Sequence, residues 1–235
     1  MSCKKPEAWG RCGKRRQQDV EREMSQTSRT IPIQVEKTAE KVHQAMELRI
    51  GALPKACYKG CGTCCHQIVD VLNWEESLVI GFLRREMPTK QKLQVRANLK
   101  SWFSAFNGAT RPANRDTPLS LAEISAVRAV FRQRRIACPF LLNNQCSIYR
   151  VRPVVCRSHI VPDNPQECFD DPGRVGTQLA RNIAREEVRA FDPAVYPLSG
   201  MPLPYLVAHE LKAQVEIRPL VAPVRGAGPA AAGGV

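Results

Sequence analysis

The sequence has no long hydrophobic run. None of its 235 residues belongs to an apolar run of eighteen or more, and residues 1–30 are polar and charged. A membrane-spanning helix needs about twenty consecutive apolar residues. A secretory signal needs a shorter apolar stretch close to the N-terminus. We therefore expect a cytoplasmic protein with no membrane insertion.

Strand patterns and the usual catalytic motifs are also scarce. The best alternating segment is 66–72, where Ile68, Val69 and Val71 favour one short strand. The chain has no internal repeat of fixed period, no glycine-rich phosphate loop and no nucleophile elbow. These absences argue against repeat proteins, nucleotide-binding α/β folds and serine hydrolases.

Helical periodicity is what the sequence does contain. Apolar residues at helical spacing predict helices over 32–53, from Asn73 through Leu83, over 89–107, over 120–135, and over about 175–191 and 203–216. Asn73 with Glu76, and Ser120 with Glu123, match the capping-box pattern, and Gly108 is placed as a helix stop. We expect a mainly α fold, a helical bundle that carries cysteine-rich loops.

The ends of the chain differ in composition from its middle. Residues 1–30 lack periodicity, and residues 221–235 are small and rich in glycine and proline. We expect a disordered basic tail over 1–30, a single domain over 31–220 and a flexible tail over 221–235. The apolar content of 43% is sufficient for a core without disulfides.

Ten cysteines are the main chemical feature of the chain. In a reducing compartment thiols stay reduced, so metal ligation or redox chemistry explains them better than a disulfide framework. Cys3 and Cys12 lie in the N-terminal tail, and we expect both to be free thiols.

The first cysteine group is compact. Cys57, Cys61, Cys64 and Cys65 form the pattern C-x3-C-x2-C-C and are followed by His66. Glycines between them allow the backbone to curl around an ion. Side chains of adjacent residues diverge, so Cys64 and Cys65 should not share one tetrahedral ion. The pair predicts two metal sites or one polynuclear site.

The second group is widely spaced, at Cys138, Cys146, Cys156 and Cys168. Alone it would be weak evidence for a metal site. Together the two groups supply eight candidate ligands, enough for two four-thiolate sites. The cysteine-bearing region spans residues 53–170.

These motifs resemble the YkgJ-type, or CxxCxxCC, family of zinc- or iron-chelating proteins. The resemblance rests on Cys57–His66 with the Glu75 and Glu76 segment after it, Cys-Pro-Phe-Leu at 138–141, Cys-Ser-Ile-Tyr at 146–149, and Arg-Pro-Val-Val-Cys-Arg at 152–157. Cys57 and Cys61 have three residues between them, whereas the family name has two. The resemblance implies metal chelation. Larger proteins with a similar region, the flagellin lysine methylases, look like enzymes.

The metal and the biological role stay open. Thiolates suit zinc, iron and iron-sulfur clusters alike. We weigh a metal-handling or redox-sensing protein, with a possible protein partner, against an iron-sulfur-dependent modifying enzyme such as a protein methylase. A third hypothesis is a structural-zinc protein that binds nucleic acid through its net charge of +13. The low aromatic content of 6% and the lack of a nucleic-acid-binding motif disfavour this hypothesis.

Charged and imidazole side chains beside the cysteines complete the candidate site. Thiolate sites carry net negative charge, which neighbouring cations can offset. Such cations are Lys55, Lys59, Arg134, Arg135, Arg150, Arg152 and Arg157. Arg152 and Arg157 are candidates to hydrogen-bond thiolates, and His66 and His159 are candidate ligands or polar neighbours.

Overall fold

The computed structural model describes residues 33–58, 60–110, 117–171, 174–190 and 200–220. The tails expected at 1–30 and 221–235, with Cys3 and Cys12, lie outside this range. The predicted mainly α class is confirmed, since the described residues contain eight α-helices and only short strands. The helices are α2 (Ile33–Gly51), α3 (Glu76–Arg85), α4 (Thr89–Ala109), α5 (Leu121–Gln133), α6 (Val154–Arg157), α7 (Pro165–Asp170), α8 (Gln178–Arg189) and α9 (Leu203–Glu210).

Two small antiparallel sheets join distant segments. Strand β1 (Asp70–Leu72) pairs with β4 (Gly200–Pro202), with Val71 opposite Met201. Strands β2 (Leu141–Leu142) and β3 (Gln145–Cys146) form a hairpin. Its two turn residues, Asn143 and Asn144, have φ of 49° and 59°, a left-handed conformation that asparagine tolerates well.

An aromatic cluster forms the centre of one half of the core. Trp102 and Phe106 of α4 stack with ring centroids 5.1 Å apart, and Phe131 of α5 meets Trp102 edge-on, also at 5.1 Å. Tyr205 of α9 closes the cluster against Phe103. This core brings together α4, α5 and α9 without using a cysteine.

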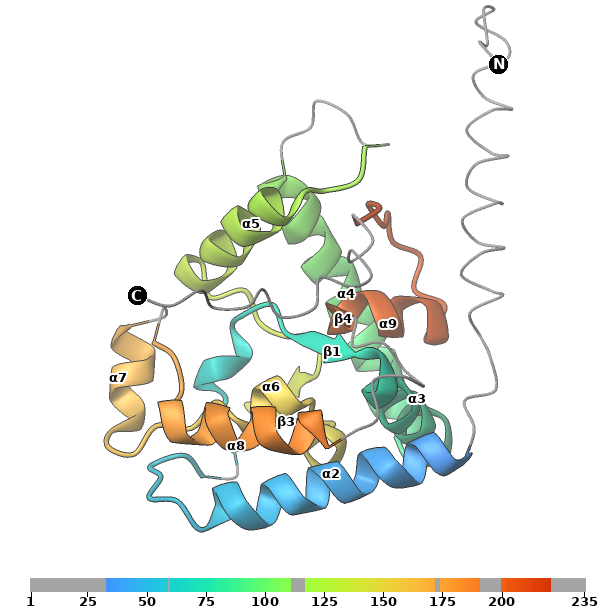
Figure 1. The fold of residues 1–235 in the computed structure, drawn as a ribbon. Coiled ribbons are helices and arrows are strands. Elements are labelled where there is room, and N and C mark those ends of the chain that lie inside the picture. The colour runs from blue at the N-terminus through green and yellow to red at the C-terminus, as the bar shows by residue number, and fades with distance from the viewer. Residues whose placement is uncertain (1–32, 59, 111–116, 172–173, 191–199, 221–235) are drawn as a thin grey trace, which may run out of the picture.

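Helix α2 supports the other half. It lies alongside α8 at the lower edge of the molecule, with α6 and β3 behind them (Figure 1). Its buried positions Val35, Ala39, Val42, Met46 and Ile50 are those that the helical spacing predicted. The segment that leaves α2 carries the first cysteine group, so this helix anchors that group to the core.

Some predicted helix ends are wrong. Asn73 does not cap α3; it opens a 3₁₀ turn, η3 (Asn73–Glu75), and α3 begins at Glu76. The reason is that His43 and the Val154 N–H hold the Glu75 carboxylate, which also accepts the Leu72 N–H at 3.1 Å and so favours the tighter turn. Helix α4 continues past Gly108 to Ala109. The Ser120–Glu123 capping box is confirmed, with Ser120 N–H 2.8 Å from Glu123 Oε2.

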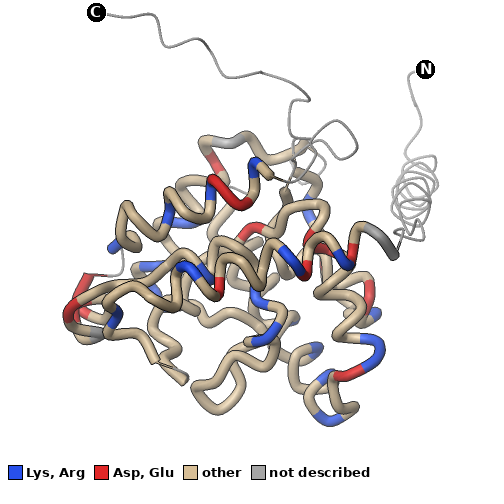
Figure 2. Tube along the Cα trace, turned by 60° about the horizontal axis from the view of Figure 1, so that its bottom comes forward, with Lys and Arg blue, Asp and Glu red and all other residues tan. Residues whose placement is uncertain are grey.

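Surface charges are mixed in sign. Lys and Arg positions alternate with Asp and Glu positions along several elements (Figure 2). Arg84 donates two hydrogen bonds to Glu210, at 2.7 and 2.8 Å, and Arg49 pairs with Glu186 and Glu187. Much of the positive charge is therefore balanced locally. In the part of the chain described here, no helix combines the length and apolarity needed to cross a bilayer.

Candidate metal centre

The eight candidate cysteines come from six places in the fold. Cys57 and Cys61 lie in the segment after α2, and Cys64 and Cys65 lie in the 3₁₀ turn η2 (Thr63–Cys65). Cys138 follows α5, Cys146 is on β3, Cys156 is on α6, and Cys168 is on α7. All eight are free, half-buried thiols.

Backbone hydrogen bonds hold the two cysteine groups against each other. The Cys138 N–H donates to the Cys65 carbonyl at 2.7 Å, which joins η2 to the chain after α5. The Ala56 N–H donates to the Val161 carbonyl at 2.9 Å, which joins the first group to the chain after α6. Helix α7 packs on η2 and brings Cys168 to the same place.

Glycines allow the first group to turn tightly. Gly60 has φ of 99°, a left-handed conformation that strains other residues. Gly62 lies close to the β2–β3 hairpin: a Cβ there would be 2.9 Å from Leu141 Cδ1. The two glycines between Cys57, Cys61 and Cys64 thus allow the tight turns of the backbone that the sequence indicated.

Cys64 lies at the electrostatic centre of the cysteines. Six of the other seven thiols sense its charge or hydrogen-bond it, namely Cys57, Cys65, Cys138, Cys146, Cys156 and Cys168. A hydrogen bond from Cys65 lowers the pKa of Cys64 to about 7. The same hydrogen bond, together with burial, raises the pKa of Cys65.

The interaction of the two thiols bears on one expectation from the sequence. Cys64 and Cys65 affect each other's pKa within the tight turn η2, while the expectation that they bind different ions stays a prediction. Two sites served by these residues would therefore adjoin each other.

The electrostatic neighbours divide the cysteines into two groups. Cys65 and Cys156 both interact with Cys138 and Cys146, and we call these four thiols the inner group. Cys168 interacts with Cys57, Cys61 and Cys64, and we call these four the outer group. Cys64 lies at the boundary, since it acts on thiols of both groups.

Burial is strongest in the inner group. It raises the pKa of Cys138 to about 12 and holds the pKa of Cys156 well above its usual range. In the outer group burial raises the pKa of Cys168 to about 11, with added repulsion from Cys57 and Cys64. The raised pKa values mean that these thiolates are unfavourable without a nearby positive charge. A bound cation would stabilise them.

Backbone N–H groups favour the thiolate forms of three cysteines. The N–H groups of Phe140 and Ile148 hydrogen-bond the sulfurs of Cys138 and Cys146. The Val161 N–H donates to Cys57 Sγ at 3.5 Å. Each of these bonds lowers a thiol pKa.

Arg152 supplies positive charge to both groups. Its charge lowers the pKa values of Cys57, Cys64, Cys146 and Cys156, while its guanidinium stacks 3.9 Å from the Tyr149 ring centroid. Arg157 instead donates to Glu47, at 2.7 Å, and to backbone carbonyls. Among the residues described, neither arginine donates a recorded hydrogen bond to sulfur, so their role is electrostatic and structural.

The two histidines border the outer group. His66 Nδ1 lies 3.1 Å from the Thr63 carbonyl, which can only accept, so Nδ1 carries the proton and Nε2 is the free nitrogen. His66 and His159 line one small cavity with Cys64 and Cys168. Burial, with the charges of Arg174 and Arg181, lowers the pKa of His159.

A buried carboxylate that the sequence did not single out as a site residue organises this region. Glu75, 1% exposed, accepts the Val154 N–H at the start of α6 at 2.7 Å and the Leu72 N–H at 3.1 Å. His43 Nε2 of α2 lies 2.8 Å from the same carboxylate. Glu75 thereby ties α2 and β1 to the helix that carries Cys156. The available signal was its place in the motif of the resemblance, three residues after the strand β1.

The donor set fits zinc or iron. Eight free thiols, N–H donors at three sulfurs and the charge of Arg152 suit a thiophilic cation. Within the described ranges, no three Cys, His, Asp or Glu side chains lie in positions from which they could hold one metal ion. The outer and inner groups supply the ligands that a coordination shell would draw on.

Comparison with known proteins identifies the class. Residues 56–172 match the family model CxxCxxCC, described as a "putative zinc- or iron-chelating domain". Residues 56–172 therefore form a domain of the CxxCxxCC family, as the motifs indicated. The matched residues include all eight candidate cysteines. No curated protein and no solved structure matches the chain.

Proposed function

We propose that this protein binds zinc or iron through eight cysteine thiolates arranged as two adjoining centres. The observation that carries the proposal is that backbone hydrogen bonds and the packing of α7 on η2 hold two distant cysteine groups against each other. The inner group, Cys65, Cys138, Cys146 and Cys156, would hold one centre. The outer group, Cys57, Cys61, Cys64 and Cys168, would hold the other.

The two centres differ in enclosure, which favours metal handling over a purely structural role. In the inner group burial raises the pKa values of Cys138 and Cys156, whereas Cys64 and Cys168 of the outer group line a cavity. A structural centre needs only enclosure. The outer group adds access, which a protein that receives and releases metal requires. Because the thiols must stay reduced to bind metal, we place this function in a reducing compartment such as the cytoplasm.

Metal analysis of the full chain purified without oxygen tests the proposal. We expect about two metal ions per chain, or an iron-sulfur cluster that shows as broad visible absorption; a colourless, zinc-loaded protein would indicate zinc. Cys57→Ser should remove the outer centre and Cys156→Ser the inner one. Cys12→Ser is the matched control and should retain both. Folded protein free of zinc and iron would contradict the proposal.

A further inference from the structure

One small cavity opens beside the outer group. It is lined by Cys64 and Cys168, by His66 and His159, and by Thr63, Gln67, Arg132, Arg135, Asp171 and Arg174. Its volume of about 20 Å³ leaves room for about one water-sized group. A single donor atom, such as a carboxylate oxygen, is of that size. None of the inner-group cysteines lines this cavity.

The cavity is rich in positive charge. Three arginines line it against one carboxylate, that of Asp171. Arg174 is held by Asp163 at 2.7 Å and by Glu167. Arg135 lies 3.7 Å from the ring centroid of Phe169 and donates to its carbonyl. Arg132 lines the cavity and has no ion pair with any residue in the described part of the chain, so its charge is available to an incoming anion.

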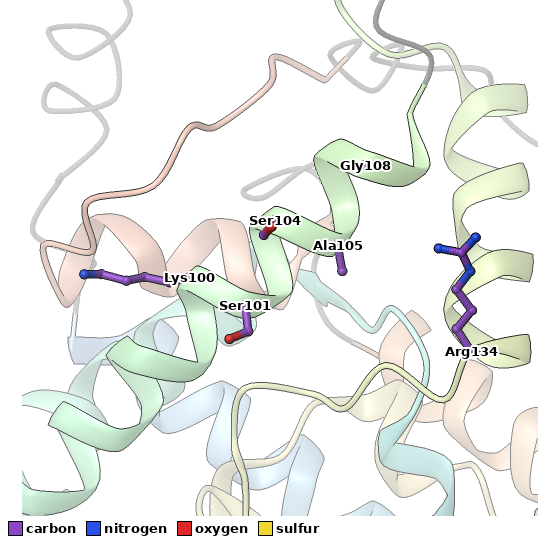
Figure 3. A pocket seen from close by; sticks show the side chains of 6 residues that line it. All are labelled: Lys100, Ser101, Ser104, Ala105, Gly108 and Arg134. Carbon is purple, nitrogen blue, oxygen red and sulfur yellow. The ribbon is translucent and has the colours of Figure 1, made fainter.

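A second depression on the surface lacks these features. It is shallow and open, lined by Lys100, Ser101, Ser104, Ala105 and Gly108 of α4 and by Arg134 (Figure 3). No cysteine or histidine borders it. Arg134 is exposed there and lies only two residues from Arg132 in the chain. It therefore provides a control of equal charge at a site without thiols.

From the cavity and its charges we infer that the Cys64–Cys168 edge is an exchange face, where metal passes between the outer group and a small anionic chelator. The inference rests on the proposed function, because it requires metal on the outer group. One donor atom of the chelator enters the cavity and reaches the metal beside Cys64 and Cys168. Arg132 attracts the chelator and offsets repulsion from the thiolates. The inner centre, none of whose cysteines lines this cavity, exchanges slowly.

The test measures metal loss from the full chain by native mass spectrometry. Metal-loaded protein is mixed either with EDTA, which is anionic, or with phenanthroline, which is neutral. With EDTA we expect one metal to leave at least about tenfold faster than the other. Cys168→Ser should remove the fast phase and keep the slow one.

Two arginine variants separate charge attraction from general destabilisation. Arg132→Ala should slow the fast phase about two- to fivefold with EDTA, the size of a part-exposed ion-pair effect, and leave phenanthroline unaffected. Arg134→Ala should change neither rate.

Each contrary outcome has a distinct meaning. Two metals that leave in one phase, or a slow phase that Cys168→Ser removes, would overturn the exchange face and leave metal binding intact. Equal effects of Arg132→Ala and Arg134→Ala would overturn the role of Arg132. A chain that never holds metal would overturn this inference and the proposed function together.

Discussion

Single residues decide how firmly the cysteine segments are held. Glu75 accepts two backbone N–H groups, from Leu72 and Val154, while its carboxylate meets His43. A glutamine at this position would have to turn its NH₂ group toward one of those donors. A buried donor left without an acceptor costs about 1–3 kcal/mol.

We therefore expect Glu75→Gln to lower the free energy of unfolding by about 1–3 kcal/mol, measured by urea denaturation of metal-loaded protein. Glu40→Gln, at an exposed position of α2, serves as the control. A Glu75→Gln variant as stable as Glu40→Gln would contradict the bridging role.

Glu76 makes a separate prediction about pH. Burial raises the pKa of its carboxyl from 4.5 to about 7. The folded protein therefore holds a proton that the unfolded chain releases near pH 4.5. Stability from this group falls as pH rises from about 4.5 to about 7 and is constant above that, a total change of about 3 kcal/mol.

Replacement of this carboxyl should remove that loss. We expect Glu76→Gln to match the original chain near pH 4 and to be the more stable protein at pH 8, by urea unfolding at both values. A stability difference that does not change between pH 4 and pH 8 would show that the Glu76 carboxyl is not destabilised by burial.

At the scale of elements, the chain after α6 packs tightly on the start of α8. A Cβ on Gly176 would lie 2.7 Å from the Ser158 carbonyl oxygen and 2.9 Å from His159 Cα, both backbone atoms that cannot rotate away. The Thr177 N–H donates to the Ile160 carbonyl at 2.9 Å in the same contact. This contact fixes the segment between Cys156 and Cys168.

Gly176→Ala should therefore destabilise the protein by about 1–3 kcal/mol, the usual cost of overpacking. The control is Gly108→Ala in α4, where a Cβ meets nothing within 4 Å. An alanine in a helix is favoured over glycine by about 0.5–1 kcal/mol, so this variant should gain stability. Thermal unfolding of both variants and the original chain measures these changes. A Gly176→Ala variant as stable as the original chain would contradict the close approach.

The presence of most helices could be predicted from the sequence, because it depends on the local spacing of apolar and capping residues. The buried stripe of α2 and the capping box of Ser120 are both local, and both are confirmed. The wrong start of α3 has a tertiary cause, since Glu75 is recruited by His43 and Val154, which are remote in sequence. The inner and outer groups could not be assigned from spacing, because the folding of α6 and α7 decides which thiols meet.

At the scale of the whole molecule, the aromatic cluster and the cysteine region make separate contributions to stability, although both belong to one continuous core. The cluster around Trp102 joins α4, α5 and α9 without a cysteine. Removing metal should therefore lower the midpoint of thermal unfolding while most of the helical circular dichroism signal persists. Loss of most helical signal on chelation would contradict this separation, as would an unchanged midpoint.

The central claim is that two adjoining centres are held by sulfur alone. X-ray absorption at the metal edge, on protein purified without oxygen and with its metal content counted, tests it most directly. We predict about two metals per chain, each with about four sulfur neighbours, at about 2.3 Å if the metal is zinc. One metal per chain, or a shell with nitrogen or oxygen in place of sulfur, would contradict the account.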